Sequence, residues 1–180
     1  MGKIYTALGL MSGTSLDGVD VSIIESDGDK EFSPILDRYF EYDKELVQKI
    51  LNMRSKISSP EELNGYINEI KDLEREITLF QGMAVKRTLE ISKSHVDLIG
   101  FHGQTIFHNP ENKITKQLGD GRLLSQLTEK KVVYNFRQND LENGGQGAPL
   151  TPIFHNALVN KLNKKFSLGF PINILNIGGI

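Results

Sequence analysis

With 180 residues, 38% of them hydrophobic and 24% charged, the chain is long enough for one globular domain with a substantial core. A formal net charge of -2 gives no basic field, which excludes nucleic acid and acidic membrane surfaces as expected partners and favours a small-molecule ligand. The sequence has no cysteine, which excludes disulfides, thiolate zinc sites and a cysteine nucleophile, and a cytoplasmic location is expected. Its first ten residues contain no run that predicts a signal peptide or a membrane span.

The first half of the sequence predicts an antiparallel meander followed by helices. Apolar, β-branched runs at 4–10 and 19–24 flank a turn-rich bend, and an aromatic-rich run at 32–42 supplies a third strand. Asp43 can cap a helix that continues through Met53. Ser59 and Pro60 predict the start of a long helix to about Ser92, because apolar residues recur there at steps of three and four.

The second half predicts alternating strands and helices. Strands are expected at 96–101, 113–118, 131–136 and 172–177, and helices at 121–129 and 149–160. The segment 135–149 is expected to be a glycine-rich loop between a strand and a helix. This alternation predicts an α/β domain with a mixed sheet, and a ligand site at the C-terminal end of the strand 96–101.

The bend at 9–20 is unusually dense in glycine, hydroxyl and acidic residues. Glycines let backbone N–H groups converge on an anion, serine and threonine hydroxyls can donate to phosphate oxygens, and a nearby carboxylate can hold Mg²⁺ through water. The bend matches neither the phosphate loop that ends in Gly-Lys-Ser/Thr nor the dinucleotide fingerprint Gly-x-Gly-x-x-Gly. A long hairpin turn requires the same residue types, so these residues alone leave a phosphate site and a simple turn equally open.

Two further polar clusters follow strands. His102 and Gln104 offer an imidazole and an amide that can bind a polyhydroxylated ligand, whereas His108 is interpreted as structural. Arg137 and Asp140 are interpreted, on residue type alone, as an ion pair that fixes a loop rather than as a catalytic unit. The sequence shows no metal-ligand spacing and no Gly-x-Ser-x-Gly elbow, so no metal site and no serine nucleophile are expected.

Five segments, taken in order, resemble the anhydro-N-acetylmuramic acid kinase family. They are Gly9-Leu10-Met11-Ser12-Gly13-Thr14-Ser15-Leu16-Asp17-Gly18-Val19-Asp20, His102-Gly103-Gln104-Thr105, Phe136-Arg137-Gln138-Asn139-Asp140, Gly144-Gly145-Gln146-Gly147-Ala148-Pro149-Leu150 and Asn176-Ile177-Gly178-Gly179. The resemblance implies the ribonuclease H-like, actin-type ATPase fold of the actin, hexokinase and heat-shock ATPase superfamily, with N-terminal antiparallel hairpins in a mixed sheet flanked by helices. Residues 1–180 would then form the N-terminal α/β domain of a two-domain sugar kinase, without the second domain.

The same resemblance implies a reaction and a set of ligands. An ATP-dependent kinase with Mg²⁺ would couple hydrolytic opening of 1,6-anhydro-N-acetylmuramic acid to phosphorylation at O6, giving N-acetylmuramic acid 6-phosphate in peptidoglycan recycling. The segment that matches the family's ATP-phosphate loop consists of Gly13, Thr14, Ser15, Leu16, Asp17, Gly18, Val19 and Asp20. The candidates on the sugar side are His102, Gln104, Asp140, Gly144 and Gly145.

The resemblance also implies what this chain lacks. The family's general base belongs to a segment that follows Gly178 and Gly179 and does not occur before Ile180, so the chain alone is expected to be inactive. Self-association through an exposed apolar face is expected, with a homodimer as one form of it. Two other interpretations stay open, because a fold does not fix a reaction: a non-catalytic ligand-binding or assembly domain, and a related sugar or acyl kinase with another substrate.

Overall fold

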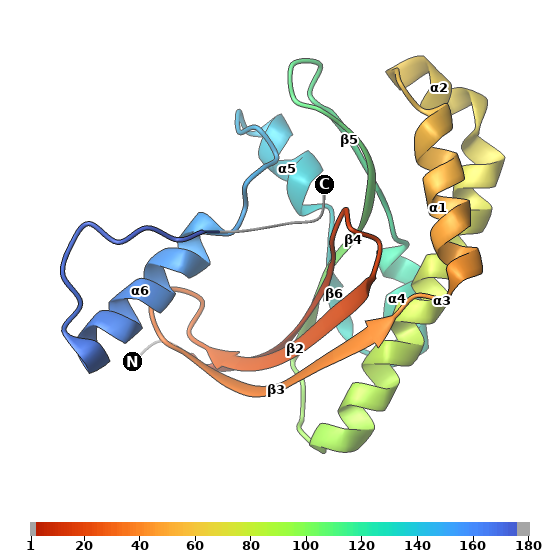
Figure 1. The fold of residues 1–180 in the computed structure, drawn as a ribbon. Helices are drawn as coiled ribbons and strands as arrows, with labels where there is room; N and C mark the ends of the chain where they lie inside the picture. The colour runs from red at the N-terminus through yellow and green to blue at the C-terminus, as the bar shows by residue number, and fades with distance from the viewer. Residues whose placement is uncertain (1–2, 176–180) are drawn as a thin grey trace.

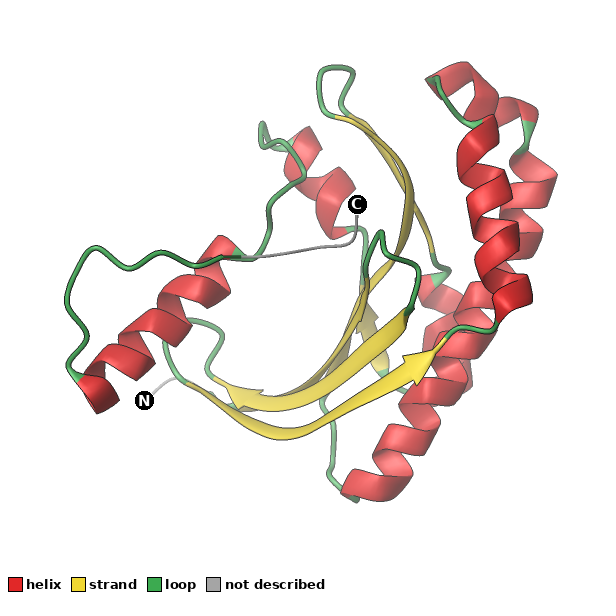
Figure 2. Cartoon of the chain, in the orientation of Figure 1, coloured by secondary structure: helices red, strands yellow, loops and turns green. Residues whose placement is uncertain are grey.

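The computed structural model describes residues 3–175, which form a curved mixed sheet with helices on both sides (Figure 1; Figure 2). The strand order is β3-β2-β1-β4-β5, and β6 pairs with β4. The strands are β1 (Tyr5–Ser12), β2 (Gly18–Ser26), β3 (Phe32–Glu41), β4 (Leu98–Asn109), β5 (Ile114–Leu118) and β6 (Lys131–Val133). The helices are α1 (Lys44–Lys56), α2 (Pro60–Gly65), α3 (Ile67–Ser92), α4 (Gly121–Thr128), α5 (Phe136–Glu142) and α6 (Pro152–Phe166).

The N-terminal meander confirms the prediction for residues 4–42. β1 pairs antiparallel with β2, and β2 pairs antiparallel with β3. β1 then pairs in parallel with β4, which places the C-terminal ends of these two strands at the same edge of the sheet. This mixed sheet with antiparallel N-terminal hairpins and flanking helices confirms the predicted fold class and is consistent with an actin-type ATPase fold.

Alternation along β2 separates the two faces of the sheet. Val19, Val21 and Ile23 are fully buried beneath α3 and α4, whereas Asp20 is exposed on the opposite face. α1 to α4 lie on the buried side, and α5 and α6 lie on the other (Figure 1). We call this second side the open face.

A second apolar cluster joins α1 and α3 to the ends of β4 and β5. Its buried members are Leu16, Tyr42, Leu46, Ile50, Met53, Ile57, Ile70, Leu73, Ile77, Ile106 and Leu118. The capping prediction for α1 is confirmed, because the Asp43 carboxylate accepts a hydrogen bond of 2.8 Å from the Leu46 N–H. None of the described helices combines the length and the apolar character needed to cross a membrane.

Several predicted boundaries were wrong. The single helix expected from Pro60 to Ser92 is divided into α2 and α3 at Tyr66, directly after Gly65. The strand expected at 96–101 is much longer, so residues 102–105 lie inside β4 rather than beyond its end. β6 ends at Val133, and Phe136 begins α5 inside the segment expected to be a loop.

The C-terminal predictions also need correction. The helix expected at 149–160 runs instead from Pro152 to Phe166. Residues 172–175 of the predicted last strand form no strand, and the rest of that strand and the motif Asn176-Ile177-Gly178-Gly179 lie outside the described residues.

Candidate functional site

The loop between β1 and β2, residues 13–17, lies at the edge where β1 and β4 end side by side. Leu16 is the residue that fixes its shape, since its side chain is only 2% exposed and packs in the second apolar cluster. Its φ of 59° lies in the left-handed region, which costs a residue with a Cβ roughly 1 kcal/mol. Burial of the leucine side chain offsets that strain.

Hydrogen bonds fix the flanks of the loop and leave its tip exposed. The Tyr42 N–H donates to the Asp17 carbonyl at 3.1 Å, and Arg54 donates to the Thr14 carbonyl at 3.2 Å. The Ser15 hydroxyl donates to the Asp17 carboxylate at 2.5 Å. Within residues 3–175, the exposed backbone N–H groups of Thr14 and Ser15 have no acceptor, so they are free to bind an anion.

Glycine is required at the end of this loop because β3 lies against it. A Cβ at Gly18 would stand 2.3 Å from the Phe40 carbonyl oxygen and 2.9 Å from the Tyr39 ring. At Gly13 the nearest atom to a Cβ would be the Ser15 hydroxyl oxygen, at 3.3 Å. The glycine at position 18 therefore permits close strand packing, whereas the one at position 13 leaves the bend open.

Acidic side chains surround the open-face side of the loop. Partial burial, together with the negative charges of Asp17 and Asp37, raises the pKa of Asp20. Burial and the charges of Asp17, Glu41 and Asp20 likewise raise the pKa of Tyr39. The field next to the loop is therefore negative and favours a cation beside any phosphate bound there.

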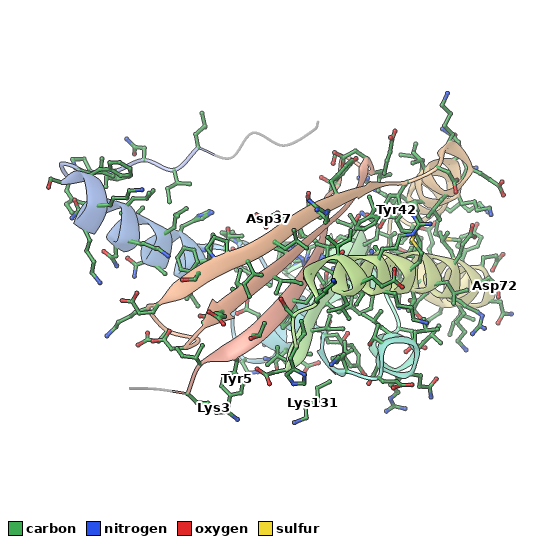
Figure 3. The ribbon with its side chains drawn as sticks, turned by 90° about the horizontal axis from the view of Figure 1, so that it is seen from below. Lys3, Tyr5, Asp37, Tyr42, Asp72 and Lys131 are labelled. Atoms are coloured by element: carbon green, nitrogen blue, oxygen red, sulfur yellow. The ribbon has the colours of Figure 1, made fainter. Side chains whose placement is uncertain are left out.

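A buried set of polar side chains lies directly beneath the loop. The Ser12 hydroxyl is 2.5 Å from the Gln104 Oε1 and 3.0 Å from the Gly18 carbonyl oxygen, and the Gln104 Nε2 donates to the Gly13 carbonyl at 3.0 Å. The Tyr42 hydroxyl donates to Ser12 at 3.0 Å and accepts from the Gln81 Nε2 at 2.9 Å. Figure 3 shows Tyr42 between the end of β3 and α3. We call Ser12, Tyr42, Gln81 and Gln104 the buried polar chain.

An irregularity in β4 places His102 and Gln104, which are two residues apart, on opposite faces of the sheet. Phe101 pairs with Leu10 and Gln104 pairs with Ser12, so two β4 residues, His102 and Gly103, lie opposite one β1 residue. This bulge returns Gln104 to the buried side, where it is fully buried, and leaves His102 on the open face. Gly103 has a φ of 72°, and a Cβ there would be 2.5 Å from the Leu118 carbonyl oxygen.

His102 contributes to an open groove of about 590 Å³ beside α5. We call it the α5 groove. It is lined by His102, Phe136, Asn139, Asp140, Asn143, Leu150, Thr151 and Phe154. Apolar rings combined with amides and one carboxylate suit a ligand that has both hydroxyl and apolar faces.

Both ring nitrogens of His102 have partners. The Arg137 Nε donates to His102 Nε2 at 2.7 Å, and His102 Nδ1 lies 2.7 Å from the Gly103 carbonyl oxygen. Because a carbonyl can only accept, Nδ1 carries the proton and Nε2 accepts, which defines a neutral tautomer. Burial and the Arg137 charge lower the pKa of His102. The His102 ring therefore lines the groove in a fixed orientation and without charge.

The segment after α5 folds around the Asp140 carboxylate. The Gly147 N–H donates to Asp140 Oδ2 at 2.8 Å, and the Gly145 N–H donates to the Asp140 carbonyl at 2.8 Å. A Cβ on Gly145 would be 2.0 Å from Oδ2, so a side chain there would displace the carboxylate. Asp140 Oδ1 accepts no hydrogen bond within residues 3–175 and lies available to a ligand.

The structure thus divides the predicted site residues between two places. Thr14, Ser15 and Asp17 are exposed on the loop, and Asp20 is exposed on the neighbouring strand. Leu16, Gly18 and Val19 are buried and shape the backbone. His102 and Asp140 line one groove, with Gly144 and Gly145 in the segment that follows α5. Gln104, predicted with His102 on the sugar side, lies under the loop instead.

The predicted Arg137–Asp140 ion pair was wrong, because Arg137 donates to His102 and to the Gly147 carbonyl. His108 contacts Thr115. Sequence analysis also missed Tyr42 and Gln81, and isolated residues of those types on a strand end and a helix carry no signal by which they could have been found. Within the described part of the chain, no three His, Cys, Asp or Glu side chains form a metal site.

Comparison with known proteins gives a consistent result. The family model described as anhydro-N-acetylmuramic acid kinase matches residues 5–180. A protein named anhydro-N-acetylmuramic acid kinase from Pelagibacter ubique is 57% identical to this chain over 180 residues, which cover 100% of this chain and 47% of the relative. A protein of the same name from Agrobacterium fabrum is 42% identical, and the match covers 100% of this chain and 48% of the relative. The one from Zymomonas mobilis is 40% identical, covering 97% and 47%. The chain therefore spans about half the length of these relatives.

Proposed function

Since the chain belongs to the anhydro-N-acetylmuramic acid kinase family, we propose that it supplies the phosphate-binding loop and part of the sugar site of an ATP-dependent kinase. The substrate is 1,6-anhydro-N-acetylmuramic acid and the product is N-acetylmuramic acid 6-phosphate. Residues 1–180 form the N-terminal α/β domain, and a second domain completes the active site. We place the reaction in the cytoplasm, in peptidoglycan recycling.

The observation that carries this proposal is the exposed tip of the β1–β2 loop. The N–H groups of Thr14 and Ser15 and the Thr14 hydroxyl lie together on a bend whose flanks are fixed by Leu16 and Asp17. Such a bend presents several donors to a phosphate without first having to become ordered. The residues present therefore fit the terminal phosphates of ATP.

The carboxylates of Asp17 and Asp20 fit the Mg²⁺ that accompanies ATP. Their negative field lies on the open-face side of the loop, and the raised pKa of Asp20 reflects partial burial and the neighbouring charges of Asp17 and Asp37. Mg²⁺ usually keeps several waters in nucleotide sites, so one or two carboxylates that reach it through water are sufficient. Mg²⁺ supplies positive charge that offsets the phosphate oxygens during transfer.

The α5 groove fits an amino sugar. Asp140 Oδ1 accepts from a sugar hydroxyl, and Gly145 and Gly147 keep the carboxylate aimed by donating to its backbone and to Oδ2. His102 presents a neutral ring that contributes shape without charge. Because both of its nitrogens are occupied, His102 does not serve as the base that activates water.

The chemistry requires three changes that balance. Water adds to the anomeric carbon, the bond from that carbon to O6 breaks, and O6 takes the γ-phosphoryl group of ATP to release ADP. A base must take the proton from water, and we propose that this base belongs to the part of the protein that follows Ile180. This chain's residues orient phosphate and sugar, and closure by the second domain excludes water that would otherwise hydrolyse ATP.

Isotope-labelled turnover tests the proposal. We define the family-length protein as this chain continued through the C-terminal half that its relatives possess. In H₂¹⁸O, the family-length protein should convert one anhydrosugar and one ATP to ADP and a 6-phosphate whose label is on the anomeric carbon. Label on phosphate, or binding of both ligands without turnover, would contradict the proposal; the second result would instead support a ligand-binding domain.

A further inference from the structure

The buried polar chain has a direction that its atoms determine. A backbone carbonyl only accepts, so the contact with Gly13 requires the amide nitrogen of Gln104 to face the loop. The Gln104 oxygen must then face Ser12, and it can only accept the serine proton. The Ser12 hydroxyl has one proton, and its acceptors are the Gln104 oxygen and, at 3.0 Å, the Gly18 carbonyl oxygen. Ser12 must therefore accept from the Tyr42 hydroxyl.

The same reasoning extends into α3. A tyrosine hydroxyl that donates to Ser12 must accept from Gln81, so the Gln81 amide nitrogen faces Tyr42. This orientation leaves Gln81 Oε1 without a partner, and it is the buried side-chain atom that has none within the described residues. Every donated proton in the buried polar chain therefore points from α3 towards the loop. Reversing the Gln104 amide would set its oxygen against the Gly13 carbonyl oxygen, which also accepts from the Leu16 N–H at 3.3 Å.

The buried polar chain ends at the two stems of the β1–β2 loop. Gln104 binds the carbonyl of Gly13 at its start, and Ser12 lies within hydrogen-bond distance of the carbonyl of Gly18 at its end. Because a trans peptide directs its C=O and N–H groups to opposite sides, the inward Gly13 carbonyl turns the Thr14 N–H outward. The next peptide, which carries the Ser15 N–H, is held by Arg54 through the Thr14 carbonyl. Gln104, Tyr42 and Gln81 are all buried and cannot reach a ligand in the α5 groove.

We propose that Gln104, Tyr42 and Gln81 are positioning residues for ATP, which set the backbone of the phosphate-binding loop from beneath. This inference rests on the proposed function and reassigns Gln104 from the sugar to the nucleotide. Loss of one link should allow the stems to rotate and the N–H groups of the tip to lose their alignment. The effect should appear in affinity for the nucleotide and leave affinity for the sugar intact.

A crossed set of variants in the family-length protein tests it. Tyr42→Phe removes one hydroxyl, and Tyr5→Phe, at the end of β1 opposite the loop, is its matched control. Gln104→Met removes the amide at similar size, and Gln117→Met on β5 is its control. We expect Tyr42→Phe and Gln104→Met to raise KM for MgATP by about tenfold, with KM for the anhydrosugar unchanged, and the controls to change neither.

Hydrogen exchange separates this inference from the proposed function. In the ligand-free protein, Tyr42→Phe should accelerate amide exchange at residues 13–17 and Tyr5→Phe should not. Equal KM values for MgATP in wild type and Tyr42→Phe, or a rise in KM for the sugar in Gln104→Met, would overturn the inference. If the wild-type protein bound no MgATP while exchange still responded to Tyr42→Phe, the proposed function would fail and the positioning of the loop would stand.

Discussion

The β1–β2 loop and the α5 groove are built by opposite means. At Gly18 the backbone of β3 packs directly against the loop, since the Phe40 carbonyl oxygen is 2.3 Å from the place of a Cβ. Buried side chains also hold the loop from beneath. At Gly145, the tightest point beside the groove, the neighbour is the end of a side chain, the Asp140 carboxylate. Because backbone atoms surround the β1–β2 loop, it has little freedom to change shape, whereas the side chains beside the α5 groove can move to fit a ligand.

The strongest test of this contrast is a pair of glycine substitutions in the meander. Gly18→Ala forces β2 and β3 apart and should lower the free energy of unfolding by about 3 kcal/mol. Gly9→Ala adds the same methyl group where nothing lies within 4 Å and should change it by less than about 0.5 kcal/mol. Urea unfolding followed by circular dichroism measures both. Equal losses would show that β3 does not hold the loop in the way described.

A smaller effect is expected at the groove. Gly145→Ala should displace the Asp140 carboxylate, break its hydrogen bond with the Gly147 N–H, and cost about 1 kcal/mol. In an Asp140→Ala background the same substitution should cost almost nothing, because the clashing atoms are gone. A double-mutant cycle by chemical denaturation gives the coupling energy. An undiminished cost in that background would place the strain elsewhere.

Arg137→Met sharpens the account of His102. Removing the guanidinium takes away a positive charge and the donor to Nε2, both of which favour the neutral ring, so the pKa of His102 should rise. Titration of the ring protons by nuclear magnetic resonance measures this directly. Arg122→Met, on the exposed side of α4, is the control and should leave the titration of His102 as it is. A pKa that falls in Arg137→Met would contradict the effect assigned to the Arg137 guanidinium.

The smallest effect should be a dependence of stability on pH. The pKa of His102 in the folded chain is below its ordinary value of 6.5, so the unfolded state binds the proton more readily. The contribution of His102 to stability is therefore fully present above pH 6.5 and is lost as the pH falls below that value towards the folded pKa. His102→Gln should reduce the loss of stability between neutral and mildly acidic pH. An unchanged slope would mean that other groups carry it.

The sequence predicted the meander and most helices because strands and helices leave a period of two or 3.6 in the apolar residues. It predicted the loop at 13–17 because glycine, serine and aspartate concentrate there. It did not reveal the bulge at His102 and Gly103, which depends on pairing with β1, and so it grouped His102 with Gln104. Two residues apart in a regular strand would share a face, and one extra residue reverses that.

The polar partners beneath the loop were beyond sequence reasoning for a related reason. Tyr42 and Gln81 come from a strand end and a helix, and only the packing of α3 against β3 brings their side chains together. Arg137 was paired with Asp140 on residue type alone, but the segment after α5 folds back and supplies Asp140 with backbone donors instead. The roles predicted for the individual site residues stay predictions, as does self-association.

The most direct measurement is an amide titration of the loop itself. In family-length protein labelled with ¹⁵N at threonine and serine, addition of MgATP should shift the Thr14 and Ser15 amide signals saturably, and Tyr42→Phe should weaken the response. The anhydrosugar alone should leave these two signals in place. If MgATP saturated the protein while the Thr14 and Ser15 signals stayed unmoved, the loop would not be the phosphate site.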